Sequence, residues 1–275
     1  MNFLVIGKGN WSHNYVETIN KHPKASLSIH LSARAAINDS KINLKYFETI
    51  IEKYNIDIII LSAIPSAQIK ILKLLLEFKG SIILEKPLFT SQNDKDFFKN
   101  LPSSIKSRIF VNHFHFFSED FLKTINKLKS KHINKIHIYD YGKGPNREFI
   151  SPIFDWGPHS FGIVSHFAEN FQINEIIKKD SLYGEKWFIS LKTNSNIKIK
   201  ILTGNGFNDK KRRVIFYDNS MKKIIYEESQ KKLNFSSMYC LIDSSINNNQ
   251  IIDTYSIAFN SCSSILKIKN FQKNS

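Results

Sequence analysis

The stretch NFLVIGKGNWSHNYVETINKHP, residues 2–23, places a short apolar run directly before two glycines and a segment of helical periodicity. Tyr15, Val16 and Ile19 recur at helical spacing in that segment. Pro23 stands just past its far end, where a helix is expected to stop. The order of strand, glycine turn and helix is the opening unit of a dinucleotide-binding βαβ fold.

The same alternation continues to about residue 117. The run at 56–65 is apolar without polar alternation, which indicates a strand covered on both faces. We therefore predict an α/β fold whose N-terminal part, residues 1–117, is a Rossmann domain with a doubly wound parallel sheet. Its expected strands are 2–7, 26–34, 56–65, 81–85 and 107–114.

After residue 117 the rhythm changes. Two helical segments (118–132 and 157–170) flank a strand at 133–142, and alternating runs then follow one another without helices. They are 171–179, 186–193, 196–204, 212–218 and 222–229. We predict that residues 118–275 form an α+β domain for substrate binding and dimerisation, with an open, mainly antiparallel sheet. The last helix, 250–271, could return to the first domain, and the basic run KKRR (210–213) is expected in a solvated hairpin loop.

Composition limits the partners. The chain has 275 residues and a net charge of +15, but its lysines are scattered and no recognised nucleic-acid motif accompanies them. No run approaches the roughly 18 apolar residues of a membrane span, and the amino terminus lacks the pattern of a signal peptide. Cys240 and Cys262 have no metal-ligand spacing. We expect a cytoplasmic protein that binds neither nucleic acid nor membrane.

The first candidate site is the turn Gly7-Lys8-Gly9-Asn10-Trp11-Ser12. In a dinucleotide fold the first glycine makes the tight turn and the second lets the backbone approach the pyrophosphate. A third small residue, here Ser12, allows helix and strand to pack closely. We expect Gly7, Gly9, Asn10, Trp11 and Ser12 to bind the cofactor, with the pyrophosphate at the amino end of the helix.

The end of the second strand distinguishes the two nicotinamide dinucleotides. NAD sites usually offer an acidic residue there to the ribose, whereas NADP sites offer an arginine. Residues 26–38 contain no acid, and Ser32 and Arg34 stand at this point. The sequence therefore favours NADP(H) over NAD(H), although a solvated Arg34 would look the same.

Two further stretches carry reactive side chains. In SIILEKPLFT (81–90), Glu85 and Lys86 follow an apolar run and precede Pro87, although lysine is rarely buried without a partner. In GPNREFISPIFDWGPHSFGIV (144–164), Asp155 and His159 lie four residues apart. If a helix begins near residue 156 or 157, this pair lies within reach of a common substrate.

Taken in order and spacing, FLVIGKGNWSHNY, DIIILSAIPSAQ, SIILEKPLFTS and FDWGPHSFGIV resemble the Gfo/Idh/MocA family of NAD(P)-dependent oxidoreductases, which includes glucose–fructose oxidoreductase and inositol dehydrogenase. The resemblance is firmest over residues 1–165, and Glu85-Lys86-Pro87 is its most specific element. It implies a Rossmann domain followed by an α/β domain whose open sheet forms a homodimer or homotetramer.

The resemblance also implies site residues. Lys86 would be the active-site lysine, Asp155 and His159 the D-x-x-x-H pair, and Pro65 the proline of the loop near the nicotinamide. Ala63, Glu85 and Lys86 are counted with the cofactor-binding residues for the same reason. Near Pro65 the family usually has a histidine, where this chain has Gln68 and Ile69.

This implies hydride transfer between a nicotinamide and a carbinol or carbonyl carbon. His159 would act as general base or acid, Asp155 would orient it or contact the substrate, and Lys86 would stabilise charge on the reacting oxygen. A sugar, nucleotide-sugar or cyclitol is the expected small-molecule substrate. An imine or tetrapyrrole reductase, a non-catalytic NADP(H)-binding protein and a pure interaction protein stay open. His113 and His115 lack a third ligand of clear spacing, so no metal is expected.

Overall fold

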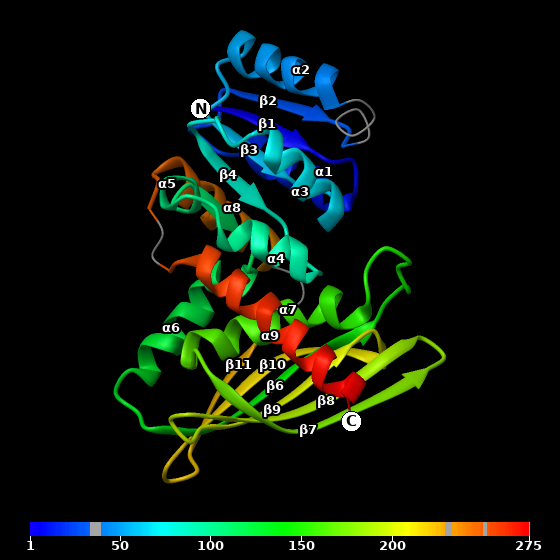
Figure 1. Ribbon diagram of the computed structural model, residues 1–275. Coiled ribbons are helices and arrows are strands. Elements are labelled where there is room, and N and C mark those ends of the chain that lie inside the picture. Colours follow the sequence, from blue (N-terminus) through cyan, green and yellow to red (C-terminus); the bar gives the residue numbers. More distant parts are fainter. Residues whose placement is uncertain (34–39, 229–232, 250–251, 275) are drawn as a thin grey trace.

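In the computed structural model, which describes residues 1–33, 40–228, 233–249 and 252–274, the chain is built around two β-sheets (Figure 1). The first has five parallel strands in the order β2-β1-β3-β4-β5. The second has six strands in the order β11-β10-β6-β9-β8-β7, antiparallel except for the pair β6 and β9. The predicted fold class is confirmed.

The first sheet is covered on both faces, as its continuous apolar strands predict. Its strands are β1 (Asn2–Ile6), β2 (Leu27–Leu31), β3 (Ile58–Leu61), β4 (Ser81–Leu84) and β5 (Ile109–Val111). The helices that follow them are α1 (Asn10–Asn20), α2 (Ser40–Lys53), α3 (Pro65–Leu74), α4 (Gln92–Lys99) and the short α5 (Ser103–Lys106). Helix α1 packs on one face, and α2, α3 and α4 pack on the other.

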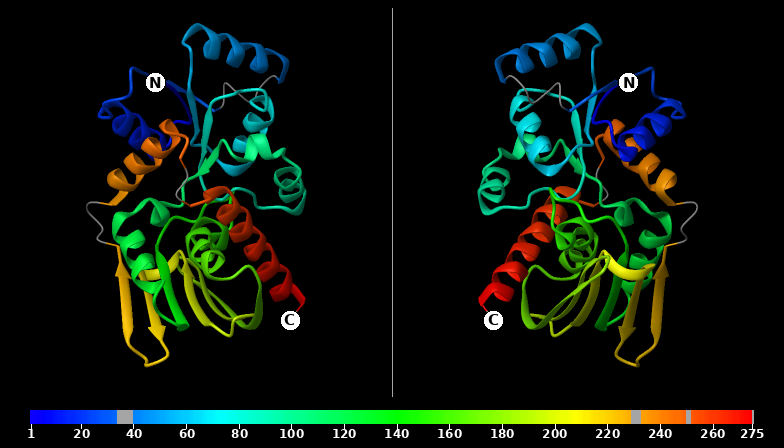
Figure 2. Two further views of the ribbon diagram at one scale, coloured as in Figure 1. Left: turned by 90° about the vertical axis from the view of Figure 1, so that its left-hand side faces the viewer. Right: turned by 90° about the vertical axis from the view of Figure 1, so that its right-hand side faces the viewer.

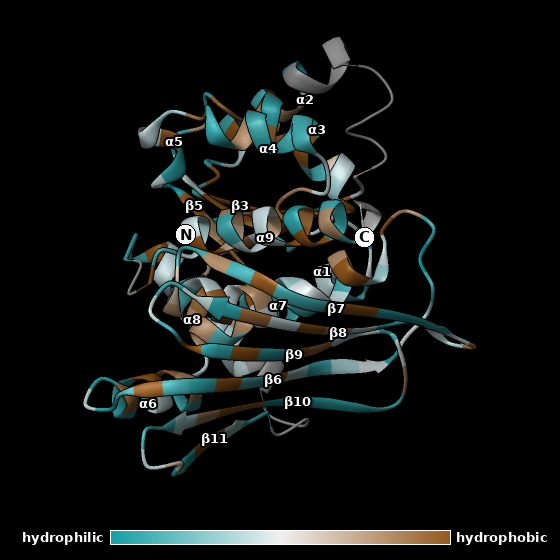
Figure 3. Ribbon diagram, turned by 60° about the horizontal axis from the view of Figure 1, so that its bottom comes forward, coloured by the Kyte–Doolittle hydropathy of each residue, from teal (hydrophilic) through white to brown (hydrophobic). Residues whose placement is uncertain are grey.

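The second sheet is covered on one face only. Its strands are β6 (Ile133–Lys143), β7 (Phe171–Ser181), β8 (Gly184–Thr193), β9 (Lys198–Gly204), β10 (Gly206–Asp218) and β11 (Lys223–Glu227). Alternate residues such as Ile136, Ile138, Val214 and Phe216 are buried against helices, as the period of two requires. The covering helices are α6 (Glu119–Leu128) and α7 (Pro152–Phe167). Figure 3 shows the opposite face without helices over it.

The last two helices connect the two halves. Helix α8 (Leu233–Ile246) packs beside α1 on the first sheet, where Met238, Leu241 and Ile242 join the core. Helix α9 (Thr254–Asn274) begins at β5, where the Thr254 hydroxyl accepts a hydrogen bond from the Val111 amide at 3.1 Å. It then runs along α7 towards β7 (Figures 1 and 2). Helix α9 is therefore anchored on both sheets, whereas α8 packs on the first.

Three sequence expectations differ from the structure. The run KKRR lies inside β10 instead of a hairpin loop. Its two arginines pair with acids on or directly after the neighbouring strands: Arg212 with Asp140 on β6 and with Glu228 just after β11, and Arg213 with Glu227 on β11. Helix α7 begins at Pro152, which suits the first position of a helix. Helix α8 has no counterpart in the sequence analysis, since its serines have weak helix propensity and its packing against α1 stabilises it. Among the described residues, no helix combines the length and apolarity that crossing a bilayer requires.

Candidate active site

The glycine turn lies between β1 and α1. Gly7 has φ +147°, and a Cβ there would come within 2.0 Å of the Ser62 carbonyl oxygen at the end of β3. Only glycine allows this approach. A Cβ on Gly9 would meet nothing within 4 Å, and α1 has no side-chain cap at its amino end. The turn therefore leaves backbone N–H groups open towards a space that could hold a phosphate.

Ser12 takes the place of a third glycine. Its side chain is fully buried and its hydroxyl donates to the Gly9 carbonyl at 2.7 Å. Asn10 and Trp11 are exposed beside the turn. Ser12 can therefore be buried at this position, because its hydroxyl is bonded to the backbone of the turn.

Two histidines that the sequence analysis did not single out also hold this turn. His30 on β2 donates from Nε2 to the Gly7 carbonyl at 2.5 Å, and His13 on α1 donates from Nδ1 to the Gly9 carbonyl at 3.0 Å. Ser32 directly follows β2, whereas Arg34 lies outside the described residues. The glycine spacing predicted the turn, but no local pattern in the sequence indicated that His30, on the next strand, would contact it.

The end of β3 meets the end of β4 through Gln68. Pro65 is the first residue of α3, and Ala63 is half-buried in the loop before it. The Gln68 side chain donates to the Glu85 carbonyl at 3.0 Å and accepts from the Glu85 amide at 2.8 Å. Gln68 therefore fixes the backbone beside Lys86.

Glu85 points into the first domain. Its Oε1 accepts from the Tyr15 hydroxyl at 2.8 Å and from the Asn112 amide at 2.8 Å. Burial raises the pKa of the Glu85 carboxyl, while these two donors and Lys86 oppose the rise. Burial, followed by the charge of Glu85, also raises the pKa of Tyr15. The Glu85 cluster, defined as Glu85, Tyr15 and Asn112, ties β4 to α1 and to the end of β5.

Lys86 points the other way, towards α7. It precedes a cis peptide bond to Pro87, and its ammonium group donates to the Asp155 main-chain oxygen. The Nζ atom is also 3.6 Å from Asp155 Oδ1, which lies 3.5 Å from Arg147 Nη1. Lys86 and Asp155 keep 19% and 18% of their side-chain surface exposed, so a ligand can reach them. The lysine at the edge of the parallel sheet thus pairs with the first turn of a helix on the second sheet.

His159 follows one turn later on α7. Its ring lies 4.2 Å from that of Phe114, 5.6 Å from His115 and 5.7 Å from His113, centroid to centroid. Phe114 and His115 belong to a short 3-10 helix, η1 (Phe114–Phe117), which follows β5. The predicted strand at 107–114 is therefore shorter, and the two histidines lie beyond it.

The three histidines are buried close to two cations. Burial and then the charge of Lys86 lower the pKa of His113 to about 3. Burial lowers the pKa of His159 well below its ordinary value, and Lys86, His115, His113 and Arg212 act in the same direction. Among the described residues, Nδ1 of His159 and both ring nitrogens of His113 are buried without a partner. His159 is thus neutral at neutral pH, the form that accepts a proton.

A second charged cluster lies beneath these rings on the inner face of the second sheet. Arg212 Nε is 3.2 Å from Asp140 Oδ1, and Arg212 Nη1 is 3.1 Å from Glu228 Oε2. The guanidinium lies 4.7 Å from the centre of the Phe114 ring. Burial raises the pKa of Asp140 to about 6, although Arg212 and Lys86 oppose the rise. We call Asp140, Arg212 and Glu228 the Arg212 cluster, which the sequence analysis did not identify.

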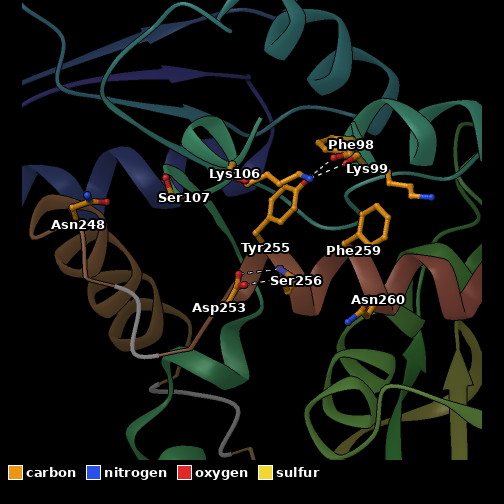
Figure 4. A pocket seen from close by; sticks show the side chains of 11 residues that line it. Phe98, Lys99, Lys106, Ser107, Asn248, Asp253, Tyr255, Ser256, Phe259 and Asn260 are labelled. Atoms are coloured by element: carbon orange, nitrogen blue, oxygen red, sulfur yellow. Dashed lines mark hydrogen bonds between the residues drawn. The ribbon is translucent and has the colours of Figure 1, made fainter. Parts of the chain in front are cut away.

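A cavity of about 610 Å³ lies elsewhere, between α4, α5 and the start of α9 (Figure 4). Two of its polar groups bond to the main chain: Lys106 donates to the Lys99 carbonyl at 2.7 Å, and the Tyr255 hydroxyl donates to the Phe98 carbonyl at 2.6 Å. It does not include Lys86, Asp155 or His159. Within the described ranges, no group of three or more His, Cys, Asp or Glu side chains has an arrangement that would hold a metal ion.

The chain was compared with known proteins. No family model matches it, and no curated protein matches it. Among solved structures, a Gfo/Idh/MocA family oxidoreductase from Vibrio cholerae has a TM-score of 0.71 at 10% identity, covering 100% of both chains. The chain has the Gfo/Idh/MocA fold.

Two similar structures are inositol dehydrogenases. A myo-inositol dehydrogenase from Corynebacterium glutamicum has a TM-score of 0.74 at 11% identity, covering 97% of this chain and 96% of that one. A scyllo-inositol dehydrogenase from Lactobacillus casei, solved with bound NAD(H) and scyllo-inositol, has a TM-score of 0.73 at 10% identity and covers 100% and 98%. At these identities the likeness shows the Gfo/Idh/MocA fold alone.

Proposed function

We propose that this protein is an NAD(P)-dependent oxidoreductase that transfers a hydride between a nicotinamide and a carbinol or carbonyl carbon of a small polar substrate. One observation supports the proposal: Lys86, at the carboxyl edge of the parallel sheet that also carries the glycine turn, pairs with Asp155 on α7, and His159 follows one turn later on that helix, where the charge of Lys86 acts on its ring. In open α/β sheets, ligands bind outside this edge. A sugar, a nucleotide-sugar or a cyclitol is the proposed substrate class.

The glycine turn fits a dinucleotide. The open space over Gly9 and the uncapped amino end of α1 would receive the pyrophosphate. The absence of an acid near Ser32 supports NADP(H) over NAD(H). A bound nicotinamide would supply the hydride acceptor or donor.

The side chains would manage the proton and the charge. Neutral His159 would take the hydroxyl proton of the substrate during oxidation and return it during reduction. Lys86 would donate a hydrogen bond to the reacting oxygen and stabilise its negative charge. Asp155 holds the Lys86 ammonium and would contact the substrate or orient these groups.

We also propose the division of labour between the halves. Residues 1–117 would bind the dinucleotide, and residues 118–275 would bind the substrate and form a homodimer or homotetramer. The face of the second sheet that has no helices over it supports this assembly (Figure 3). Size-exclusion chromatography with light scattering measures the state directly, and a monomer at all concentrations would contradict it.

Titration of NADPH and of NADH, followed by nicotinamide fluorescence, tests the function. We expect saturable binding, with NADPH tighter than NADH. Turnover is then measured with a panel that includes myo-inositol, scyllo-inositol and aldose sugars. Gly7→Ala serves as the matched variant, because its Cβ would clash with Ser62 and should abolish binding. Absence of binding for both dinucleotides would exclude the oxidoreductase function.

A further inference from the structure

His13 and His30 have no role in the hydride transfer proposed above, yet both contact the glycine turn. Their rings are perpendicular, with centroids 5.2 Å apart. A carbonyl oxygen only accepts, so the hydrogen of His30 lies on Nε2 and that of His13 on Nδ1. The remaining nitrogen of each ring is a lone-pair acceptor in the neutral form. It becomes an N–H donor when the ring gains a proton.

The two histidines contact the glycine turn from different elements, His13 from α1 and His30 from β2. His13 is in the first turns of α1, and its side chain leans back over the amino end of that helix. His30 is the penultimate residue of β2, whose end faces the ribose in this type of fold. A pyrophosphate at α1 or a ribose phosphate at β2 would therefore lie near these rings.

The surrounding charges favour an anion. Strands β1 and β2 and the residues 7–9 and 32–33 carry no Asp or Glu. The charged side chains on the described elements around the pair are Lys8 in the turn and Glu17, four residues after His13 on α1. Imidazole changes charge between pH 5 and 8, so a phosphate can draw a proton onto it.

We propose that His13 and His30 bind a phosphate group of the dinucleotide, and that binding is accompanied by uptake of a solvent proton onto the pair. The imidazolium then donates a charge-assisted hydrogen bond to a phosphate oxygen. The inference rests on the proposed function, because it needs a dinucleotide in this site. An N–H bond forms on one ring with a proton from solvent, no bond between heavy atoms changes, and the N–H bond breaks to return the proton to solvent when the ligand leaves.

Two substitutions keep the hydrogen bonds that support the glycine turn but remove the ability of the side chains to become charged. In His30→Gln, the side-chain amide can still donate to the Gly7 carbonyl, and in His13→Asn it can still donate to the Gly9 carbonyl. Neither amide can gain a proton. The double variant is compared with wild-type protein by fluorescence titration of NADPH and NADH at pH 6, 7 and 8 in 0.15 M salt. Thermal unfolding controls for the fold.

We expect the wild-type protein to bind tighter than the double variant at pH 6 by about tenfold, and the two to converge at pH 8. The phosphate of the ligand also titrates in this pH range, but this affects both proteins equally, so the ratio of wild-type affinity to double-variant affinity at each pH is free of it. A gap found only for NADPH assigns the contact to the ribose phosphate, and a gap for both ligands assigns it to the pyrophosphate.

Equal affinities of wild type and double variant at all three pH values would overturn the inference and leave the oxidoreductase function intact. A constant gap that does not change with pH would also overturn it, since it would mean that the rings only support the turn. Failure of wild-type protein to bind either dinucleotide contradicts the proposed function itself. The three results are therefore distinguishable.

Discussion

Each of the two sheets buries a carboxylate cluster near Lys86, and the two clusters are satisfied in different ways. The Glu85 cluster on the first sheet uses neutral donors, a phenol and an amide. The Arg212 cluster on the second sheet uses a guanidinium shared by two acids. Burial raises the pKa of Glu85 and of Asp140, so neither site is easy for a carboxylate to occupy.

The different partners of the two carboxylate clusters indicate what each half of the molecule contributes to the candidate site. Neutral donors fix the position of the Glu85 side chain, and Gln68 fixes its backbone, so the position of the next residue, Lys86, is fixed as well. The guanidinium instead adds positive potential to the rings of His115 and His159, whose pKa values it helps to lower. The first sheet therefore fixes the position of Lys86, and the second adds the charge of Arg212 to that of Lys86 around the histidine rings.

Lys86 lies where the two clusters meet, and its removal should have the largest effect. Lys86→Met keeps the length of the side chain but removes the donor to the reacting oxygen. We expect turnover to fall by about 10²- to 10³-fold, with dinucleotide affinity and unfolding temperature nearly unchanged. Steady-state kinetics on the best substrate of the panel measure this effect.

The control for Lys86→Met is Lys79→Met, because Lys79 is 85% exposed and far from the candidate site. This variant should keep wild-type turnover. Full turnover in Lys86→Met would remove the lysine from the mechanism.

Substitution in the Glu85 cluster should have the next largest effect, on the free energy of unfolding. Glu85→Ala leaves the Tyr15 hydroxyl and the Asn112 amide without their acceptor inside the protein. Each unsatisfied buried donor costs about 1–3 kcal/mol, so we expect the free energy of unfolding to fall by about 3 kcal/mol. Urea denaturation measures it, and Glu77→Ala, at a 97% exposed side chain, is the control. A loss equal to that of the control would mean that the network does not stabilise the fold.

The sequence predicts the reactive residues of the candidate site better than it predicts the two buried clusters. Gly7, Glu85, Lys86, Asp155 and His159 stand in short local patterns, where a strand end or a helical spacing determines their neighbours. The neighbourhood of Gly7, Glu85 and Lys86 follows from the parallel topology, since the carboxyl ends of parallel strands share one edge, whereas Asp155 contacts Lys86 from α7 on the second sheet. This part of the site could therefore be anticipated.

The Arg212 cluster could not, because it depends on pairing between strands far apart in the chain. Arg212 pairs with Asp140 in the register of β10 and β6, across about 70 residues of sequence. Read locally, KKRR is a run of four cations, and nothing within it shows which one turns inward. Gln68 and His30 were missed for the same reason, since each contacts a distant backbone group.

The neighbouring residues Glu227, at the end of β11, and Glu228, directly after it, test whether burial determines how much the Arg212 cluster stabilises the fold. Glu228 pairs with buried Arg212, whereas Glu227 pairs with Arg213 and its side chain is 48% exposed. Glu228→Gln should lower the free energy of unfolding by about 2 kcal/mol, because a buried cation loses half of its compensation. Glu227→Gln should cause no measurable change. Equal effects of the two variants, measured by urea denaturation, would contradict the role of burial.

The last comparison concerns stability at low pH, where a buried histidine and a buried aspartate change the free energy of unfolding in opposite directions. His113 has a folded pKa of about 3 against 6.5 for the free side chain, so the unfolded chain binds the proton first. Its contribution to stability is complete above pH 6.5 and is lost as the pH falls towards 3. Asp140, with a folded pKa of about 6, is protonated first in the folded state, so its contribution is lost as the pH rises towards 6.

The variant His113→Gln isolates the contribution of the histidine to the pH dependence of stability. Between pH 6.5 and 5, the wild-type protein should lose about 1.4 kcal/mol per pH unit that the variant retains, because glutamine has no proton to gain. Urea denaturation at the two pH values measures the difference, and His132→Gln, an exposed histidine, should behave as wild type. If His113→Gln lost stability with acid as steeply as the wild type, the ring would take up its proton without unfolding. Burial between Lys86 and His159 would then impose no cost on the charged form, and the neutral state assigned to His159 would lose its physical basis.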